Sequence, residues 1–284
     1  MIMVQAAGYS DIGKVRKANE DCFLINEPIG LYVVADGMGG HLGGGVASRI
    51  AVETIDGYMA APSQVFTPED GTSAVDRQSE AAKYHLRESI FLANQKIYKQ
   101  SLTDKACRGM GTTVSALFLA GNSIITANVG DSPIYLLRNR EIETLYTPHT
   151  LLHEQKKIPK SMEGRFPKSK LAHILTRAVG IRSDVGVDLV ETPCFSDDII
   201  VLCSDGLSGK ISREEIRDLV CQNDSTSACK KLTDLANQRG GEDNITVIVV
   251  RVTSAKERSA NGLRGRIAGI PAWIASLFGV KKQS

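Results

Sequence analysis

The chain has 284 residues, of which 42% are hydrophobic and 23% charged, and its formal net charge is +2. This is the composition of a globular protein long enough to bury a sizeable core, and the charge is too small to indicate a nucleic-acid-binding surface. No stretch reaches the ~18 apolar residues of a membrane span, and the first residues do not resemble a secretory signal. The six cysteines are scattered without a CxxC pair, so a reduced, cytoplasmic protein is expected.

In chain order, short apolar or alternating runs predict strands at 4–9, 22–25, 31–35, 113–119, 123–129, 134–138, 141–145, 187–191, 199–203 and 245–252. Helical spacing of apolar residues predicts helices at 44–59, 76–101, 213–220 and 226–238. Strands come in clusters and helices in pairs. This order favours an α+β fold with antiparallel sheets and helices packed outside them, and disfavours a doubly wound parallel sheet.

Two irregular segments interrupt these elements. Residues 61–72 form a polar loop with two prolines, and residues 148–170 are rich in lysine and interrupted by proline and glycine. Loops of this length inside a domain are usually functional or mobile.

Carboxylates stand at the ends of strongly apolar strands, as in "VVADGMGGH" at 33–41. The acids in such positions are Glu20, Asp21, Asp36, Asp131, Asp205 and Asp243. Each alone also reads as a turn, because Asp-Gly and Gly-Asp are common turn dipeptides. If the strand ends share one rim of a sandwich, however, the like charges repel unless a cation compensates them. Oxygen ligands without a cysteine or histidine cluster suit Mg²⁺ or Mn²⁺ and argue against zinc.

Asp36 and its glycines suggest what these ions would do. A central carboxylate can bridge two ions, and Gly37 lets the backbone offer its carbonyl to one of them. Two divalent ions about 3.5–4 Å apart activate a water and clamp a displacement at phosphorus. Arg16 has the planar guanidinium that fits a phosphate.

Taken in order, the motifs resemble the PPM/PP2C family of metal-dependent protein serine/threonine phosphatases in its compact bacterial form, from about residue 9 to 252. They read "GKVRKANED", "VVADGMGGH", "GMGTTVSAL", "ANVGDSPIYLL", "LTRAVG", "VLCSDGLSG" and "EDNITVIVV". The resemblance implies a four-layer αββα fold, a central antiparallel β-sandwich flanked by helices, with a metal centre at one end. It also implies direct attack by a metal-bridging water on phosphoserine or phosphothreonine, without a phosphoenzyme.

Carried over residue by residue, the resemblance makes Asp36, Asp205 and Asp243 the ligands of a first metal. Asp36, the Gly37 carbonyl and Glu20 would hold the second.

Three further roles follow from the same resemblance. Asp21 would orient a metal-bound water, Asp131 with Asp205 would form a third, weaker site, and Arg16 would contact the phosphate. Two Mn²⁺ or Mg²⁺ ions, or three, are therefore expected.

The sequence also departs from the family pattern. Met38 stands where animal members have a histidine proposed as general acid, so protonation of the leaving group by a metal-bound water is expected. His41 is expected to be a loop residue. Pro133 replaces the arginine that usually follows the third-site motif. Residues 148–170 match the place of the family's mobile flap, and His149 is expected to be an exposed flap residue.

The predicted organisation is a phosphatase domain at 1–253 and a basic tail at 254–284. The tail has six basic residues, one acid, and apolar residues at helical spacing around Trp273. Such a segment can bind an anionic membrane surface or a partner; a docked terminal helix and a disordered end are the alternatives.

The function expected is dephosphorylation of proteins, opposing a bacterial serine/threonine kinase, by a monomer that binds no nucleic acid. Two alternatives remain open at this point: a phosphomonoesterase acting on small molecules, and a catalytically silent module on the same fold that binds phosphoproteins.

Overall fold

The computed structural model describes residues 2–39, 43–61, 74–154, 171 and 174–255. His41, most of the predicted loop at 61–72, residues 155–170 of the predicted flap and nearly all of the predicted tail lie outside these residues.

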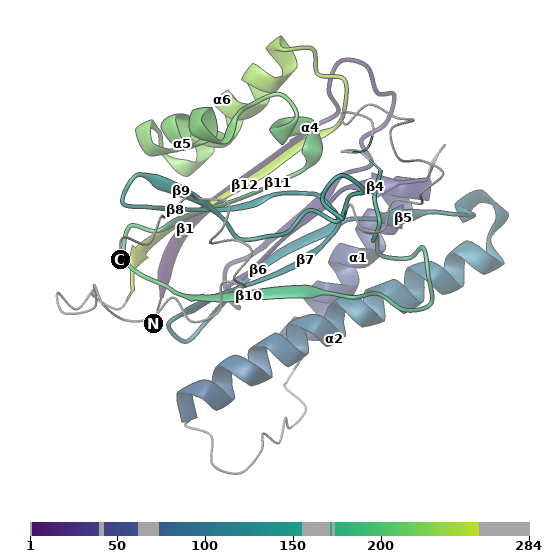
Figure 1. Ribbon diagram of the computed structural model, residues 1–284, viewed down its shortest axis with the longest axis horizontal. Helices are drawn as coiled ribbons and strands as arrows, with labels where there is room; N and C mark the ends of the chain where they lie inside the picture. The colour runs from purple at the N-terminus through teal and green to yellow at the C-terminus, as the bar shows by residue number, and fades with distance from the viewer. Residues whose placement is uncertain (1, 40–42, 62–73, 155–170, 172–173, 256–284) are drawn as a thin grey trace, which may run out of the picture.

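Within the described residues, two five-stranded antiparallel sheets form the centre of the protein (Figure 1). The first sheet has the order β1-β12-β11-β8-β9. Its strands are β1 (Met3–Asp11), β8 (Ile134–Arg138), β9 (Glu141–Thr144), β11 (Ile199–Cys203) and β12 (Ile245–Ser254). The second has the order β10-β7-β6-β3-β2. Its strands are β2 (Cys22–Asn26), β3 (Leu31–Ala35), β6 (Val114–Ala120), β7 (Ser123–Val129) and β10 (Asp188–Pro193).

Helices cover the outer face of each sheet. The pair α1 (Gly43–Ala60) and α2 (Ala74–Thr103) packs on the sheet that contains β3, and the pair α5 (Arg213–Gln222) and α6 (Ser225–Gln238) packs on the sheet that contains β12. A third apolar cluster, from the facing sides of both sheets, fills the space between them. The predicted αββα sandwich is therefore confirmed, as are the predicted strands and helices to within a few residues.

Among the described residues, four short elements were not predicted, because they contain too few residues to show a period. They are β4 (Gly37–Met38), β5 (Gly111–Thr112), the 3-10 helix η1 (Lys105–Cys107) and α4 (Asp205–Ser208). None of the described helices combines the length and the apolar character needed to cross a bilayer.

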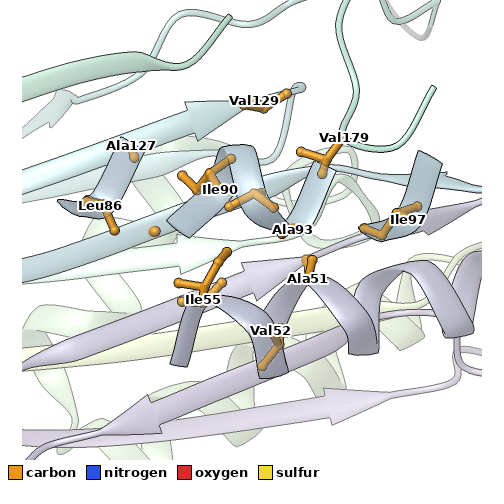
Figure 2. Packing of buried hydrophobic residues seen from close by; sticks show 14 of the residues in the cluster. Ala51, Val52, Ile55, Leu86, Ile90, Ala93, Ile97, Ala127, Val129 and Val179 are labelled. Carbon is orange, nitrogen blue, oxygen red and sulfur yellow. The ribbon is translucent and has the colours of Figure 1, made fainter. Parts of the chain in front are cut away.

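The apolar stripe of α2 explains why this helix lies flat on its sheet. Leu86, Ile90, Ala93 and Ile97 recur every three or four residues, which places them on one helix face, and all four are fully buried. Figure 2 shows them packed toward α1 and the sheet.

Antiparallel pairing brings the predicted acids to one end of the sandwich. Cys22 pairs with Ala35, so Asp21, just before β2, lies beside Asp36, just after β3. Cys203 pairs with Val247, so Asp205, just after β11, lies near Asp243, just before β12. The end of one strand is thus always beside the start of its neighbour.

A matched pair of substitutions on α2 tests this packing. Leu86→Ala removes a fully buried side chain and is expected to lower the free energy of unfolding by about 2–5 kcal/mol. Leu102→Ala, on the same helix but 70% exposed, is expected to change it by less than about 0.5 kcal/mol. Chemical denaturation measures both, and equal losses would contradict the assigned face of α2.

Candidate active site

A cleft of ≈ 1110 Å³ opens at the end of the sandwich where the acids gather. The predicted site residues that line it are Arg16, Glu20, Asp36, Gly37, Asp131, Asp205 and Asp243. The segment before β10 forms another part of its wall, with Thr176, Arg177 and Arg182 among the lining residues. Asp21 does not line the cleft and lies behind these residues.

Asp36 is fixed through its backbone at the end of β3. Its N–H donates to Thr113 Oγ1 (3.0 Å), and its carbonyl accepts from Thr113 N (2.8 Å) and Thr112 Oγ1 (2.9 Å). Burial raises the pKa of the Asp36 carboxyl well above its usual range, and nearby carboxylates raise it further. In decreasing order these are Asp21, Asp205, Asp243 and Asp131. The predicted acids therefore do act on one another electrostatically, as the sequence argument required.

Position 37 has no room for a side chain. A Cβ there would lie 2.2 Å from the Gly44 carbonyl oxygen and 2.5 Å from that of Glu20. Gly37 lets three backbone segments meet at the floor of the cleft: the turn after β3, the start of α1 and the segment before β2. This close approach is the structural reason for the glycine that follows Asp36.

Arg16 and Asp243 form an ion pair on the cleft wall. Arg16 Nη2 donates to Asp243 Oδ2 (2.6 Å), and Asp243 Oδ1 accepts from the Asn244 N–H (2.8 Å). The hydrogen bond to Asp243 also raises the pKa of Arg16, so the guanidinium is fully charged.

Asn244 is a structural residue of the site that sequence reasoning missed. Its Oδ1 accepts from Glu20 N (2.8 Å), and its Nδ2 donates to the carbonyls of Ile12 (2.9 Å) and Ala18 (3.0 Å). It thus holds the segment that carries Arg16 and Glu20 against the start of β12. The motif "DN" was the available signal, but only the strand register shows what the amide contacts.

Asp21 lies behind the cleft, where two hydroxyl groups contact its carboxylate. Its Oδ2 accepts from Ser204 Oγ (2.8 Å) and Thr246 Oγ1 (2.6 Å), while Oδ1 is buried without a hydrogen-bond partner. Burial outweighs these hydrogen bonds and raises the pKa of Asp21 to about 6.

Asp131 follows a tight turn at the end of β7. Gly130 has φ +113°, and a Cβ there would lie 2.6 Å from Thr113 Cγ2. Burial, and then the charge of Asp205, raise the pKa of Asp131 to about 7. Asp131 faces the cleft even though Pro133 replaces the usual arginine.

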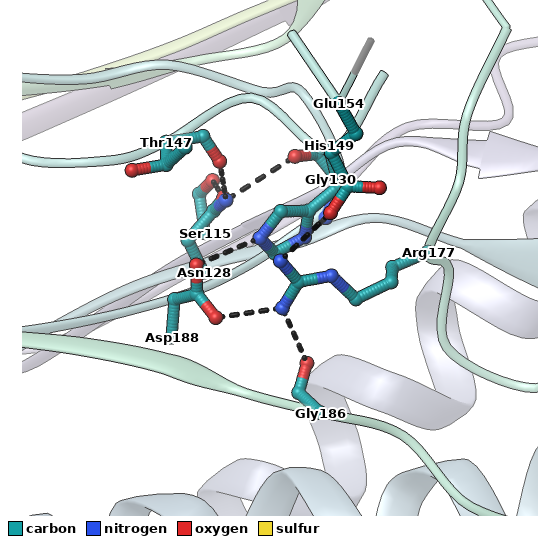
Figure 3. A network of polar contacts seen from close by, with 9 residues as sticks. All are labelled: Ser115, Asn128, Gly130, Thr147, His149, Glu154, Arg177, Gly186 and Asp188. Atoms are coloured by element: carbon teal, nitrogen blue, oxygen red, sulfur yellow. Dashed lines mark hydrogen bonds and ion pairs between the residues drawn. The ribbon is translucent and has the colours of Figure 1, made fainter. Parts of the chain in front are cut away.

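The expectation that His149 is exposed was wrong. Its side chain is fully buried and hydrogen-bonded to Gly130 and Asp188 (Figure 3). The sequence placed it in a lysine-rich loop, but residues 149–152 bond instead with Leu171 and residues 174–176.

A family model described as protein phosphatase 2C matches residues 14–246. The chain belongs to the protein phosphatase 2C family. It is 34% identical over 247 residues to the serine/threonine phosphatase stp of Listeria welshimeri, covering 85% of this chain and 93% of the relative. It is 33% identical over 247 residues to protein phosphatase PhpP of Streptococcus pneumoniae, covering 85% and 94%. The solved catalytic domain of the serine/threonine protein phosphatase PstP in complex with two manganese ions superposes with a TM-score of 0.72 at 30% identity, covering 89% and 100%.

The residues of this phosphatase 2C cleft fit divalent cations in their chemistry. The donors are all oxygen atoms, the carboxylates raise one another's pKa, and Glu20 Oε1 and Asp21 Oδ1 are buried without hydrogen-bond partners. In their present positions, the described side chains include no group of three histidine, cysteine, aspartate or glutamate residues that could hold a metal ion. Both oxygens of Asp243 already accept hydrogen bonds, one from Arg16 and one from the Asn244 N–H.

The clustered acids predict an unusual pH dependence of stability for the metal-free protein. The pKa values of Asp21 and Asp131 are raised to about 6 and about 7 in the folded state, whereas unfolded carboxyls titrate near 4. The folded state therefore binds more protons between about pH 4 and 7, and stability falls as pH rises through that window. In EDTA, we expect the Tm to be roughly 5 °C higher at pH 5.5 than at pH 8.

Asp36→Asn should raise the Tm at pH 8, since it removes one of the repelling charges, and should flatten the pH dependence. Asp234→Asn, at an exposed position on α6, is the control and should change neither. Calorimetry of the three proteins checks this, and a Tm that is flat or higher at pH 8 in the wild type would contradict the proximity of the charges.

Proposed function

We propose that this protein hydrolyses phosphoserine and phosphothreonine in proteins with Mn²⁺ or Mg²⁺ bound in the cleft, as two ions or three. The observation that carries the proposal is the set of mutually perturbed carboxylates at the floor of a cleft that Arg16 also lines. Membership of the protein phosphatase 2C family supports it, as do relatives named serine/threonine phosphatases.

For the metals, we propose Asp36, Asp205 and Asp243 as ligands of one ion, and Asp36, Glu20 and the Gly37 carbonyl as ligands of a second. These residues all line the cleft. The buried, unpartnered Oε1 of Glu20 supports its assignment, because such an atom is costly unless a cation or a donor approaches it.

A third, weaker ion would be held by Asp131 with Asp205, the group that also perturbs the pKa of Asp131. When bound, the ions activate a water for attack on phosphorus and neutralise charge on the phosphate.

The remaining roles belong to the protein's own side chains. Arg16, half exposed at the cleft wall, would exchange Asp243 for the phosphate oxygens of the substrate. Asp21 would orient the attacking water through Oδ1, with Oδ2 held by Ser204 and Thr246. Its pKa of about 6 allows it to act as an anionic acceptor near neutral pH.

The shape of the cleft favours a protein substrate over a small phosphate ester. The cleft is open and large, and its walls extend from Arg16 to Arg182, which leaves room for residues that flank the phosphorylated side chain. The presence of every predicted acid in or directly behind the cleft favours catalysis over a silent binding module.

We further propose a cytoplasmic monomer whose substrates are also the substrates of a cognate serine/threonine kinase. All six cysteines are free, which fits a reducing compartment. Contact of the tail at 254–284 with a partner or a membrane surface remains a proposal from its basic, amphipathic sequence.

Activity on a phosphothreonine peptide is expected to require added Mn²⁺ and to disappear with EDTA. Asp36→Asn and Asp205→Asn should each lower kcat by at least about 100-fold, because each removes a charged ligand, while circular dichroism shows the fold intact. The exposed Asp234→Asn is the matched control and should retain full activity.

Malachite-green phosphate release measures these rates. Wild-type kcat in Asp36→Asn at saturating Mn²⁺ would contradict the metal assignment. A higher kcat/KM on p-nitrophenyl phosphate than on the peptide would favour the small-molecule alternative, and peptide binding without turnover would favour the silent module.

A further inference from the structure

The buried imidazole of His149 joins two parts of the cleft that are far apart in the sequence (Figure 3). Its Nδ1 accepts from the Gly130 N–H (3.0 Å), and its Nε2 lies 3.0 Å from Asp188 Oδ2. Because Nδ1 accepts, the ring proton is on Nε2 and is donated to Asp188. One rigid ring therefore bonds the end of β7 on one side and the start of β10 on the other.

On the first side, His149 clamps the turn that carries Asp131. The Gly130 N–H donates to Nδ1, and the Gly130 carbonyl accepts from the His149 N–H (2.9 Å). Asn128 Nδ2 donates to the same carbonyl (3.2 Å). Gly130 is thus held at both its polar atoms, and the next residue is Asp131.

On the other side, the ring reaches the wall of the cleft through Asp188. Asp188 Oδ1 accepts from Arg177 Nη1 (2.6 Å), and Arg177 Nη2 donates to Glu154 Oε1 (3.2 Å). The hydrogen bond from His149 and then that from Arg177 lower the pKa of Asp188 to about 2. The carboxylate is therefore charged at every working pH. The backbone adds a further link, since Thr176 N donates to the His149 carbonyl (2.8 Å).

We propose that His149 is a positioning residue. It fixes the turn that carries Asp131 relative to the part of the cleft wall that Arg177 lines. The inference rests on the proposed phosphatase function. It assigns His149 no contact with the substrate or with a reacting atom. Its role is to hold both Asp131, a proposed metal ligand, and Arg177, on the cleft wall, through one buried ring.

The two bonds of the ring can be separated by substitution. Asn places its amide where a histidine has Nδ1, so His149→Asn keeps an acceptor for Gly130 and loses the donor to Asp188. Gln places its amide where a histidine has Nε2, so His149→Gln keeps the donor to Asp188 and loses the acceptor for Gly130. His149→Gln leaves the buried Gly130 N–H without its acceptor, whereas His149→Asn leaves the 38% exposed Asp188 without its donor. The free energy of unfolding of both variants is therefore measured beside their function, so that a loss of stability is separated from a loss of positioning.

One measurement tests the turn that carries Asp131, and a second tests the cleft wall at Arg177. Calorimetric titration of Mn²⁺ without substrate should show the weakest binding step about tenfold weaker in His149→Gln and unchanged in His149→Asn. Steady-state kinetics on a phosphothreonine peptide should show KM raised about tenfold in His149→Asn, with kcat within about twofold of wild type, and a KM near wild type in His149→Gln.

Asp188→Asn provides a variant that does not disturb the buried position. Asp188 is 38% exposed, so this protein should fold, and its KM should rise as in His149→Asn. Glu191→Gln is the matched control, because Glu191 is also on β10, 31% exposed and ion-paired, but its partner is Lys83 on α2. Its KM and Mn²⁺ titration should match those of the wild type.

Folded His149 variants with wild-type KM and Mn²⁺ binding would overturn the positioning role. Equal effects of His149→Asn and His149→Gln on both KM and Mn²⁺ affinity would also overturn it. A wild-type protein that releases no phosphate with Mn²⁺ would instead overturn the proposed function, so the two failures are distinguishable.

Discussion

Repulsion among carboxylates at one end of the sandwich is the constraint on which the site depends. Burial, and then the charges of four nearby carboxylates, raise the pKa of the Asp36 carboxyl; these are Asp21, Asp205, Asp243 and Asp131. A fold gains no stability from such an arrangement. The rest of the structure at that end holds these carboxylates in place against their repulsion. A bound divalent cation would replace this repulsion by attraction between each carboxylate and the ion.

Uncharged hydrogen-bonding residues supply that support. Thr113 holds the Asp36 backbone, Asn244 ties the segment before β2 to the start of β12, and Ser204 and Thr246 share one oxygen of Asp21. Apolar clusters between the sheets and under the helices pack the strands together. The hydrogen bonds around His149 hold the turn that carries Asp131 and the part of the cleft wall that carries Arg177.

Much of this was predictable because its signal is local. The alternation of apolar residues gave the strands, the stripe through Leu86 and Ile97 gave the longest helix, and the acids at strand ends indicated a cation site of oxygen ligands. The errors arose where a residue's surroundings come from distant segments. His149 was expected to be exposed in a loop rich in lysine, and the role of the Asn244 amide was missed, because the side-chain partners of both residues lie far away in the chain.

By itself, the sequence determined the element order and the identity of the acidic groups, since periodicity and residue chemistry are properties of short stretches. The αββα layers were expected from the resemblance to the PPM/PP2C family. Only the tertiary structure decided that Arg16 pairs with Asp243, that Asp21 lies behind the cleft and that His149 bridges two of its parts. Those contacts depend on strand register and on which side chains reach across the rim, and both are set when the two sheets pack together rather than by any local pattern.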